Sequence, residues 1–370
     1  MSTKRLWRNF DLLLLVATIC IAAIGVALIY SASISTEASE PLLERSFFRQ
    51  ALFMLSGLFI LLLVAAVDYH LLGHANWLIY AATLGILALV TVIGKAGFGA
   101  QSWLSLRRAV QPSELAKVLV IVVLAKYLAD HEEHRDRLDW LFFSALLLAP
   151  VVFLIYRQPD LGTATVLLCI WLGMVFAAGA RLLHFGLMGL GLAAIGPVVW
   201  FTLKDYMKER ILVFVNPASD VSGVSYNARQ ALISIGSGGW FGKGFLHGTQ
   251  SQLYFLRVRH TDYVFSVLCE ELGFVGALVL LLLLFILLWR ILRAARLAQD
   301  TFGRLIACGV ATMIFLQVFV NIAVNVGLLP VTGLTLPLVS YGGSSLWATL
   351  LGIGLVESVV MRHKKLEFGD

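Results

Sequence analysis

The sequence predicts an all-α polytopic membrane protein with ten transmembrane helices and one long ordered extracytoplasmic loop between spans 7 and 8. Of its 370 residues, 59% are hydrophobic and 14% are charged, whereas a soluble domain has about 45–50% apolar and about 25% charged residues. The apolar residues also gather in runs close to the roughly 20 residues that a helix needs to cross a bilayer. The ten predicted spans are 11–30, 48–67, 77–94, 113–129, 140–156, 161–179, 182–203, 263–289, 304–328 and 336–360.

The distribution of positive charge predicts the orientation of these spans. An even number of spans places both termini on one side of the membrane. With the termini inside, the inner segments hold 14 Lys or Arg residues and the short outer loops hold 6. Because Lys and Arg in short loops favour the cytoplasmic side, both termini are predicted to be cytoplasmic. The first apolar run is longer than a signal-peptide core of about 7–15 residues, so it is interpreted as an uncleaved span.

The net charge of +6 could suggest nucleic-acid binding, but the basic residues are spread over loops between apolar runs and form no separate basic face. Nucleic acid is therefore not expected as a partner. All four cysteines lie inside apolar runs without metal-ligand or disulfide spacing, and are interpreted as small buried apolar residues: Cys20, Cys169, Cys269 and Cys308.

Segment 204–262 is too long to be a simple connection. It lies outside in the predicted topology and carries seven Lys or Arg residues. Loops beyond about 12–15 residues are usually functional or disordered. Since this one is rich in glycine and aromatic residues, we expect it to be ordered and docked, within one membrane domain over residues 1–370.

Two polar groups stand inside or beside the central spans. Glu114 and Lys117 are three residues apart, hence neighbours on one helix face. They either neutralise each other or line a polar cavity for a charged substrate, since ionisable residues in spans are costly. Gln158 and Asp160 lie at a short outer turn, where Asp160 either caps the next helix or faces the same cavity.

The eighth span contains two further carboxylates below Asp262. At about 100° per residue, Glu270 and Glu271 cannot both share a helix face with Asp262. At least one must meet a cation elsewhere, and Lys117 is a candidate. The stretch GSGGWFGKG, 236–244, fails the P-loop pattern, although its amides could face a pyrophosphate.

These features suit an anionic amphiphile such as a lipid-linked phosphate, with its polar group outside. Asp262 is a candidate general base for a sugar hydroxyl. Its place at a helix start would favour the ionised form, and the bland alternative is a first-turn helix charge. Basic residues of the external loop could neutralise the phosphates: Arg210, Arg229, Lys243, Arg257 and Arg259.

Five motifs in order resemble the SEDS family (shape, elongation, division, sporulation). They are GAQSWLSLRRAVQPSELAK, QPDLGTA, YNARQALISIGSGGWFGKGFLHGTQSQLYFL, RHTDYVFSVLCEELGFVG and LLPVTGLTLPLVSYGGSS. The GTQSQL run and the short termini are more similar to the elongation members than to the division members.

The resemblance implies a ten-span peptidoglycan glycosyltransferase of the bacterial cytoplasmic (inner) membrane that polymerises lipid II and releases undecaprenyl pyrophosphate. It implies a class B penicillin-binding protein and other elongation-complex membrane proteins as partners. Asp262 matches the essential aspartate of the family. The implied substrate-binding positions are Glu114, Lys117, Gln158, Asp160, Arg210, Lys243, Arg259 and His260.

Three positions depart from the family pattern. Ser102 stands where the family usually has Arg, and Arg257 and Val258 replace Pro and Glu before the His-x-Asp motif. The lost carboxylate bears on whether a divalent cation, Mg or Mn, assists the reaction. Two alternatives stay open: a lipid II flippase that uses the Glu114/Lys117 cavity, and a non-catalytic scaffold that activates the penicillin-binding protein.

Overall fold

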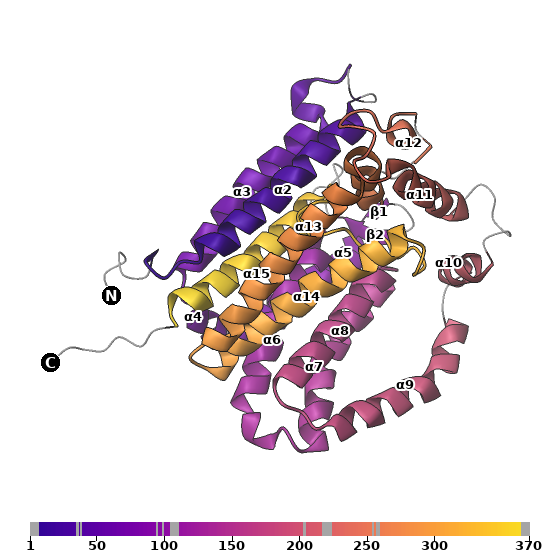
Figure 1. Ribbon diagram of the computed structural model, residues 1–370. Helices are drawn as coiled ribbons and strands as arrows, with labels where there is room; N and C mark the ends of the chain where they lie inside the picture. Colours follow the sequence, from indigo (N-terminus) through magenta and orange to yellow (C-terminus); the bar gives the residue numbers. More distant parts are fainter. Residues whose placement is uncertain are drawn as a thin grey trace.

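The computed structural model describes residues 7–34, 37, 39–93, 95–97, 100–103, 111–202, 205–216, 224–253, 255–256 and 260–363. Over these ranges the protein is a bundle of helices (Figure 1). Each predicted span overlaps one helix. These helices are α2 (Leu12–Ser33), α3 (Ser46–Ala66), α5 (Asn76–Ile93), α6 (Pro112–Asp130), α7 (Leu138–Arg157), α8 (Leu161–Ala177), α9 (Leu182–Thr202), α13 (Val264–Leu297), α14 (Thr301–Asn325) and α15 (Gly343–Met361).

Shorter elements connect the long helices. They are η1 (Leu42–Glu44), α4 (Tyr69–His74), η2 (Glu132–His134), α10 (Asp205–Val215), α11 (Val224–Gly238) and α12 (Thr249–Gln252). The strand β1 (Lys95–Gly97) pairs antiparallel with β2 (Ala100–Trp103). The all-α prediction missed this hairpin because its strands are too short to show an alternating pattern. Segment 204–262 is ordered where described, and it is built from α10, α11 and α12.

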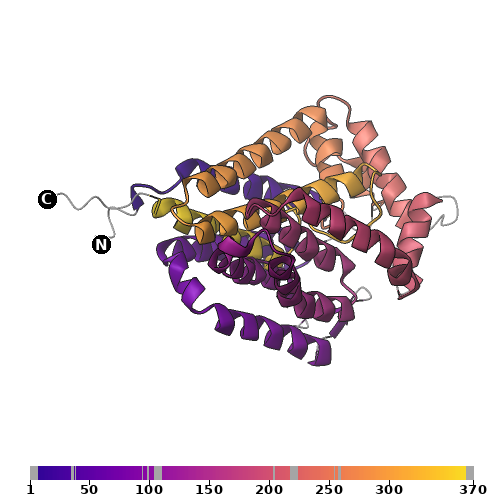
Figure 2. The ribbon, with the colours of Figure 1, turned by 90° about the horizontal axis from the view of Figure 1, so that it is seen from below.

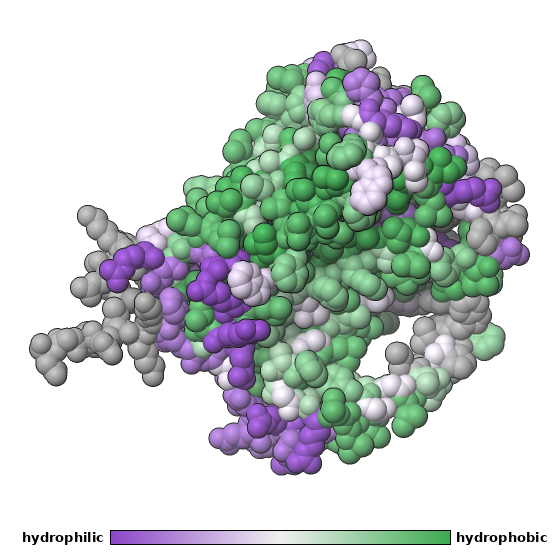
Figure 3. Space-filling view, in the orientation of Figure 1, coloured by the Kyte–Doolittle hydropathy of each residue, from purple (hydrophilic) through white to green (hydrophobic). Residues whose placement is uncertain are grey.

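The surface of the bundle is that of a multi-pass membrane protein. In the described ranges, six helices are long and apolar enough to cross a membrane: α2, α3, α7, α13, α14 and α15. Shorter apolar helices lie within α5, α8 and α9. Figure 3 shows a broad apolar face between hydrophilic regions at the two ends of the molecule. Such a belt is what a bilayer requires of the helices that face it.

The centre of the bundle is formed by α6, α14 and α15. Nearly all of α15 is buried, and α14 contacts α6, α8, α13 and α15. The fourth predicted span, which looked weakest by hydropathy, is α6, and its Val118, Ile121 and Leu124 are fully buried. Because α6 is surrounded by protein rather than lipid, it tolerates charged residues that a lipid-facing helix would not.

The beginning and the end of the bundle's helical chain are neighbours. The side chain of Asn9 donates to the carbonyl of Met361 (3.4 Å), and the backbone N–H of Asp11 donates to the Glu357 carboxylate (3.1 Å). Asp11 also pairs with Arg290, which links α2, α13 and α15. Figures 1 and 2 place α11 and α12 at the opposite end of the bundle.

The tenth span begins later than predicted. Residues 336–342 are not helical, and α15 begins at Gly343. Pro337 and two glycines interrupt the run, yet Leu336 and Val339 are fully buried. Irregular backbone at this depth is tolerated only where protein satisfies its polar groups. Here the Gln50 side chain donates to the Ser340 carbonyl (3.2 Å) and accepts from the Gly342 N–H (3.2 Å).

The eighth span is broken. Inside α13, Gly273 has φ 65° and ψ −164°, a conformation that only glycine adopts without strain. The turn after α11 fits against this break, because the N–H of Phe274 donates to the Gly239 carbonyl (2.9 Å) and that of Val275 to the Trp240 carbonyl (3.1 Å). A Cβ at Gly238 would lie 1.9 Å from the Cys269 carbonyl oxygen. The glycines of GSGGWFGKG therefore serve a backbone-to-backbone contact.

This contact predicts different outcomes for two glycines of α11. Gly238→Ala forces a methyl group into the backbone of α13 and should lower the free energy of unfolding by about 1–3 kcal/mol. Gly236→Ala is the matched control, because nothing lies within 4 Å of a Cβ built there. Thermal unfolding of the purified protein in detergent measures both. Equal midpoints for the two variants would contradict the close approach.

Candidate active site

The main chain around Asp262 is held by side chains of α14. The side-chain amide groups of Asn321 and Asn325 both donate to the Asp262 carbonyl, at 3.1 and 2.9 Å. Asn325 also accepts from the Ser266 N–H (3.1 Å) and hydroxyl (2.6 Å) in the first turn of α13. Asn321 reaches the Leu334 carbonyl at 2.8 Å. Two asparagines one turn apart thus connect the end of segment 204–262, α13, and the loop before α15.

The loop before α15 holds the residues that precede Asp262. The Ser340 hydroxyl donates to the Thr261 carbonyl at 2.6 Å, and the Tyr341 N–H donates to the His260 carbonyl at 2.8 Å. The His260 ring lies edge-on to the Tyr341 ring, with centroids 5.7 Å apart. The backbone from His260 to Asp262 is therefore fixed at consecutive residues, and this fixes where the Asp262 side chain starts.

Burial controls the charge of Asp262. Desolvation raises the pKa of Asp262 to about 6, opposed by a hydrogen bond with Thr261 and by the positive charge of Arg210. The expectation that a helix N-terminus would favour the ionised form is wrong. Helix α13 begins at Val264 with Tyr263 as its N-cap, and the loss of solvent around the carboxyl group outweighs any helix dipole. A carboxylate with this pKa is a stronger base than an ordinary aspartate and is still largely ionised at neutral pH.

Arg210 is the cation whose positive charge acts on Asp262. It belongs to α10, and its guanidinium donates to the Val331 carbonyl at 3.3 Å. That bond connects α10 to the same 326–342 loop that holds His260 and Thr261. Arg210 and Asp262, about 50 residues apart in sequence, lie close enough for the arginine's charge to lower the pKa of Asp262, an arrangement suited to binding an anion beside a base.

Glu114, Lys117 and Asp160 form a second polar group. The Lys117 ammonium donates to both carboxylate oxygens of Glu114, at 2.8 and 2.9 Å, and both side chains are buried. Asp160 caps α8, accepting from the Thr163 N–H (3.0 Å) and hydroxyl (2.8 Å). Burial raises the pKa of Asp160, the Glu114 charge raises it further, and the Thr163 bonds and Lys117 lower it.

Asp160 therefore both caps α8 and belongs to a polar cluster. The Gln111 side chain, at the start of α6, donates to the Asp160 carboxylate at 3.2 Å. Gln158 is buried and donates to the Leu87 carbonyl at 3.0 Å. Gln158 thus ties the α7–α8 turn to α5.

Lys243 is the cation that pairs with a glutamate of α13. Its ammonium donates to the Glu270 carboxylate at 2.8 Å, and the same oxygen accepts from the Thr249 hydroxyl and the Gln250 N–H, both at 3.0 Å. The suggestion that Lys117 meets one of the α13 glutamates is wrong, because Lys117 is paired with Glu114. Glu271 instead accepts from the Ser31 hydroxyl of α2.

The glycine-rich stretch does not offer its amides to a phosphate. The N–H of Gly242 donates to the Gly238 carbonyl (2.8 Å), that of Lys243 to the Glu270 carbonyl (2.9 Å) and that of Gly244 to the Glu271 carbonyl (3.0 Å). The amide hypothesis is therefore wrong for these three residues. The last two of these hydrogen bonds satisfy the carbonyls left free at the break in α13, as a helix interruption requires.

Three of the positions singled out in the sequence lie outside the described residues, and two polar residues of α14 were not predicted from the sequence. Arg257, Val258 and Arg259 are outside the described ranges. Asn321 and Asn325 were not among the candidates, although two amides four residues apart in the run FVNIAVN are a signal for buried polar contacts in a membrane helix.

No metal centre is evident in the described part of the chain. There, no group of three or more His, Cys, Asp or Glu side chains is arranged to hold a metal ion. The Asp262 carboxylate is an oxygen ligand of the kind that Mg or Mn accepts, while the positive charge of Arg210 beside it opposes a second cation.

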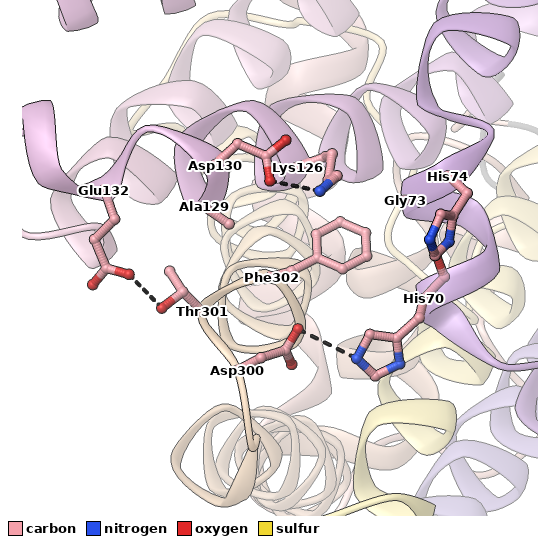
Figure 4. Close-up of a pocket in the computed structure, with 10 residues that line it drawn as sticks. All are labelled: His70, Gly73, His74, Lys126, Ala129, Asp130, Glu132, Asp300, Thr301 and Phe302. Atoms are coloured by element: carbon pink, nitrogen blue, oxygen red, sulfur yellow. Dashed lines mark hydrogen bonds and ion pairs between the residues drawn. The ribbon is translucent and has the colours of Figure 1, made fainter.

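Two pockets lie at the other end of the bundle, where α2 begins and α15 ends. The first, of about 340 Å³, lies between α4, α6 and α14 (Figure 4). Its charged groups pair with neighbours: Lys126 with Asp130 (2.5 Å) and His70 with Asp300 (3.5 Å). The second, of about 610 Å³, lies between α5, α6 and α7. Neither includes Asp262, so neither is part of the candidate active site.

The fold and the site define a multi-pass membrane protein with one anchored aspartate beside an arginine. Residues 11–365 match the family of cell cycle proteins that comprises FtsW, RodA and SpoVE. The chain belongs to this family, the SEDS proteins.

Individual relatives agree over nearly the whole chain. The peptidoglycan glycosyltransferase MrdB of Escherichia coli (strain K12) is 40% identical over 346 residues, 92% of each chain. The rod shape determining protein RodA of Thermus thermophilus has a similar crystal structure, with TM-score 0.71 and 36% identity over 97% of this chain and 99% of that one. A chain of a peptidoglycan synthase complex that coordinates polymerization and crosslinking gives TM-score 0.80 and 36% identity, covering 96% and 98%.

The asparagine contacts predict a stability effect. Asn325→Ala removes hydrogen bonds to Asp262 and Ser266 and leaves buried backbone groups without partners, which should cost about 2–3 kcal/mol of unfolding free energy. Thr312→Ala is a control on the same helix, since the Thr312 hydroxyl bonds only the Cys308 carbonyl of α14 itself (2.9 Å). Thermal unfolding in detergent separates them. A midpoint for Asn325→Ala no lower than that of the control would contradict the assigned network.

Proposed function

We propose that this protein is a peptidoglycan glycosyltransferase that polymerises lipid II into β-1,4 glycan strands during cell-wall elongation and rod-shape maintenance. The observation that carries the proposal is the half-buried Asp262, held through its main chain and placed beside Arg210. Family membership and the names of the relatives MrdB and RodA support the activity and the elongation role.

The proposed membrane arrangement has ten spans in one domain over residues 1–370, in the bacterial cytoplasmic (inner) membrane. Both termini are cytoplasmic, and 204–262 lies on the outer side with the active site. The apolar belt in Figure 3 and the wide separation of the α2 start from α11 and α12 support it. A lipid-linked substrate would then reach Asp262 with its sugars outside and its isoprenoid chain between lipid-facing helices.

The chemical step is a single displacement. A hydroxyl of one lipid-linked disaccharide attacks the anomeric carbon of another, and the bond to undecaprenyl pyrophosphate breaks. Asp262 accepts the hydroxyl proton as general base, since burial makes its carboxylate more basic. Attack from the face opposite the leaving group inverts an α-linked donor to a β product. Arg210 stabilises negative charge as the pyrophosphate leaves.

The other candidate residues take supporting roles in this proposal. Arg259 and His260, which precede Asp262 in the sequence, are assigned to binding the phosphates. Lys243, which is paired with Glu270, shapes the segment over the substrate. Glu114, Lys117, Asp160 and Gln158 border the polar interior that the substrate headgroup approaches, and the mutual pairing of Glu114 and Lys117 keeps that interior neutral.

A divalent cation, Mg or Mn, stays a prediction from the family resemblance. Polymerisation with and without EDTA tests it. Undecaprenyl pyrophosphate carries its own metal-binding oxygens, so a requirement for a cation would not by itself demand a carboxylate cluster in the protein.

The proposed partner is a class B penicillin-binding protein, which crosslinks the strands that this protein makes, together with other elongation-complex membrane proteins. The structurally similar chain that belongs to a peptidoglycan synthase complex supports this pairing. Two rivals remain testable. A lipid II flippase would move lipid II across proteoliposomes without making polymer. A scaffold would activate its partner equally well with Asp262→Asn.

Asp262→Asn tests the proposed general base directly. The amide keeps the shape of the side chain and cannot accept the proton, so polymerisation of lipid II with partner present should fall by at least about 100-fold. Binding of the partner, measured by co-purification, should be unchanged. Polymerisation at the wild-type rate would exclude Asp262 as the base.

The rate of polymerisation should depend on pH. Because burial raises the pKa of Asp262 to about 6, the base form is lost as pH falls through about 6, and the rate should fall with it. Arg210→Gln removes a charge that lowers this pKa, so the acidic limb should move to higher pH. Initial polymerisation rates between about pH 5 and about pH 8 measure the acidic limb of the wild-type protein and that of the variant. A wild-type rate that stays constant down to about pH 5, as expected for the pKa of about 4 of an ordinary aspartate, would contradict the buried base.

A further inference from the structure

The second pocket at the inner end of the bundle has the composition of a phospholipid headgroup site. It encloses about 610 Å³ between the start of α5, the end of α6 and the start of α7. Pockets of about 300–1,000 Å³ hold small organic ligands. It lies at the ends of these apolar helices, and aromatic residues gather at such ends in membrane proteins.

Aromatic rings form much of its wall. Trp77 and Tyr80 lie on one turn of α5, with ring centroids 6.2 Å apart. Tyr127 stacks on His131 at 4.5 Å. Tyr80 is fixed through a hydrogen bond from its hydroxyl to the Leu147 carbonyl of α7 (2.8 Å). Aromatic faces attract ammonium groups, and aromatic residues gather at membrane interfaces.

The pocket's charges come as a matched pair. The Arg137 guanidinium and the Asp139 carboxylate are 2.7 Å apart, and their side chains are 63% and 46% exposed. Each can therefore accept a second partner. His131 and His134 add ring nitrogens. With neutral histidines the lining has no net charge, so it suits a zwitterion better than an anion.

One buried donor in the pocket wall also has no acceptor. Trp140 is 2% exposed, and its indole N–H makes no hydrogen bond in the described structure. An unpaired buried N–H costs free energy, and a phospholipid's ester or phosphate oxygens are acceptors of the kind that this donor lacks.

An apolar track leads away from the pocket along α7. Phe143 and Leu146, which line it, are 53% and 52% exposed, and Phe153 further along the helix is 59% exposed. The spacing of these residues places them along the same side of α7, where acyl chains would lie against them.

We propose that this pocket binds a phosphoethanolamine-type phospholipid of the inner leaflet, with its phosphate at Arg137 and its ammonium at Asp139 and the aromatic rings. The phosphate–ammonium dipole lies antiparallel to the Arg137–Asp139 pair, so each charge meets its opposite. Phe302 is the one Phe, Tyr or Trp among the residues that line the neighbouring pocket in Figure 4, so that pocket lacks a comparable aromatic wall. The site is separate from Asp262 and does not depend on the proposed enzymatic activity.

The experiment is native mass spectrometry of the delipidated protein. Phosphatidylethanolamine, phosphatidylglycerol and phosphatidylcholine with identical acyl chains are added at equal concentration. Phosphatidylethanolamine should be retained about fivefold more than phosphatidylglycerol, and Arg137→Gln with Asp139→Asn should remove this preference. The matched control is Asp136→Asn with Arg181→Gln, because that pair is also exposed and at the same end (2.8 Å, 62% and 50% exposed) but outside the pocket.

Several outcomes would overturn the proposal. Equal or stronger retention of phosphatidylglycerol would exclude the zwitterion. An equal loss in the control pair would show that general surface charge is responsible. Displacement of phosphatidylethanolamine by equimolar lipid II would make the pocket part of the substrate path. Trp77→Ala provides a second variant, expected to weaken retention through the aromatic wall alone, and thermal unfolding checks that each variant is folded.

Discussion

The organisation of this protein around Asp262 depends on two side-chain amides in a buried helix. Asn321 and Asn325 hold the carbonyl of Asp262, the first turn of α13 and the loop before α15. In an apolar bundle each backbone group that leaves a helix needs a partner from protein. Two non-helical stretches and the start of a helix meet here, and asparagine supplies both donors and acceptors to satisfy their backbone groups. The Asp262 carboxylate therefore starts from a backbone that has little freedom to move.

The break in α13 gives the segment that contains α11 and α12 a rigid support. A continuous helix would leave no free carbonyls for the 239–244 turn, whereas the break at Gly273 exposes those of Glu270 and Glu271 to the N–H groups of Lys243 and Gly244. The Glu270 carboxylate pairs with Lys243 and accepts a hydrogen bond from the Gln250 N–H, which fixes α12 beside the same break. Charged residues within the eighth span thus act as structural anchors, and the segment above the site is held by the membrane helix itself.

Charge inside the bundle is handled in two ways. Glu114 and Lys117 satisfy each other on α6, so their burial requires no outside partner. Asp262 has only partial compensation from Arg210 and Thr261, and its pKa stays raised. The two charges of a buried ion pair neutralise each other, whereas a carboxylate that is only partly compensated accepts a proton more easily. This difference separates a framework residue from the proposed base.

By itself the sequence determined the membrane class, the ten helical segments and Asp262 as the central candidate, because apolar run length and isolated charges are local properties of a chain. It also indicated the Asp160 cap and the Glu114–Lys117 pair, which depend on residues three apart. Only the tertiary structure decided that Lys243, and not Lys117, neutralises Glu270, that the glycines serve a broken helix, and that residues 336–342 enter the bundle without helix. These contacts join segments tens to hundreds of residues apart, and no spacing rule encodes which of several cations or carbonyls a folded chain brings together. The pKa of Asp262 belongs to the same group, since it depends on how completely neighbouring helices exclude water.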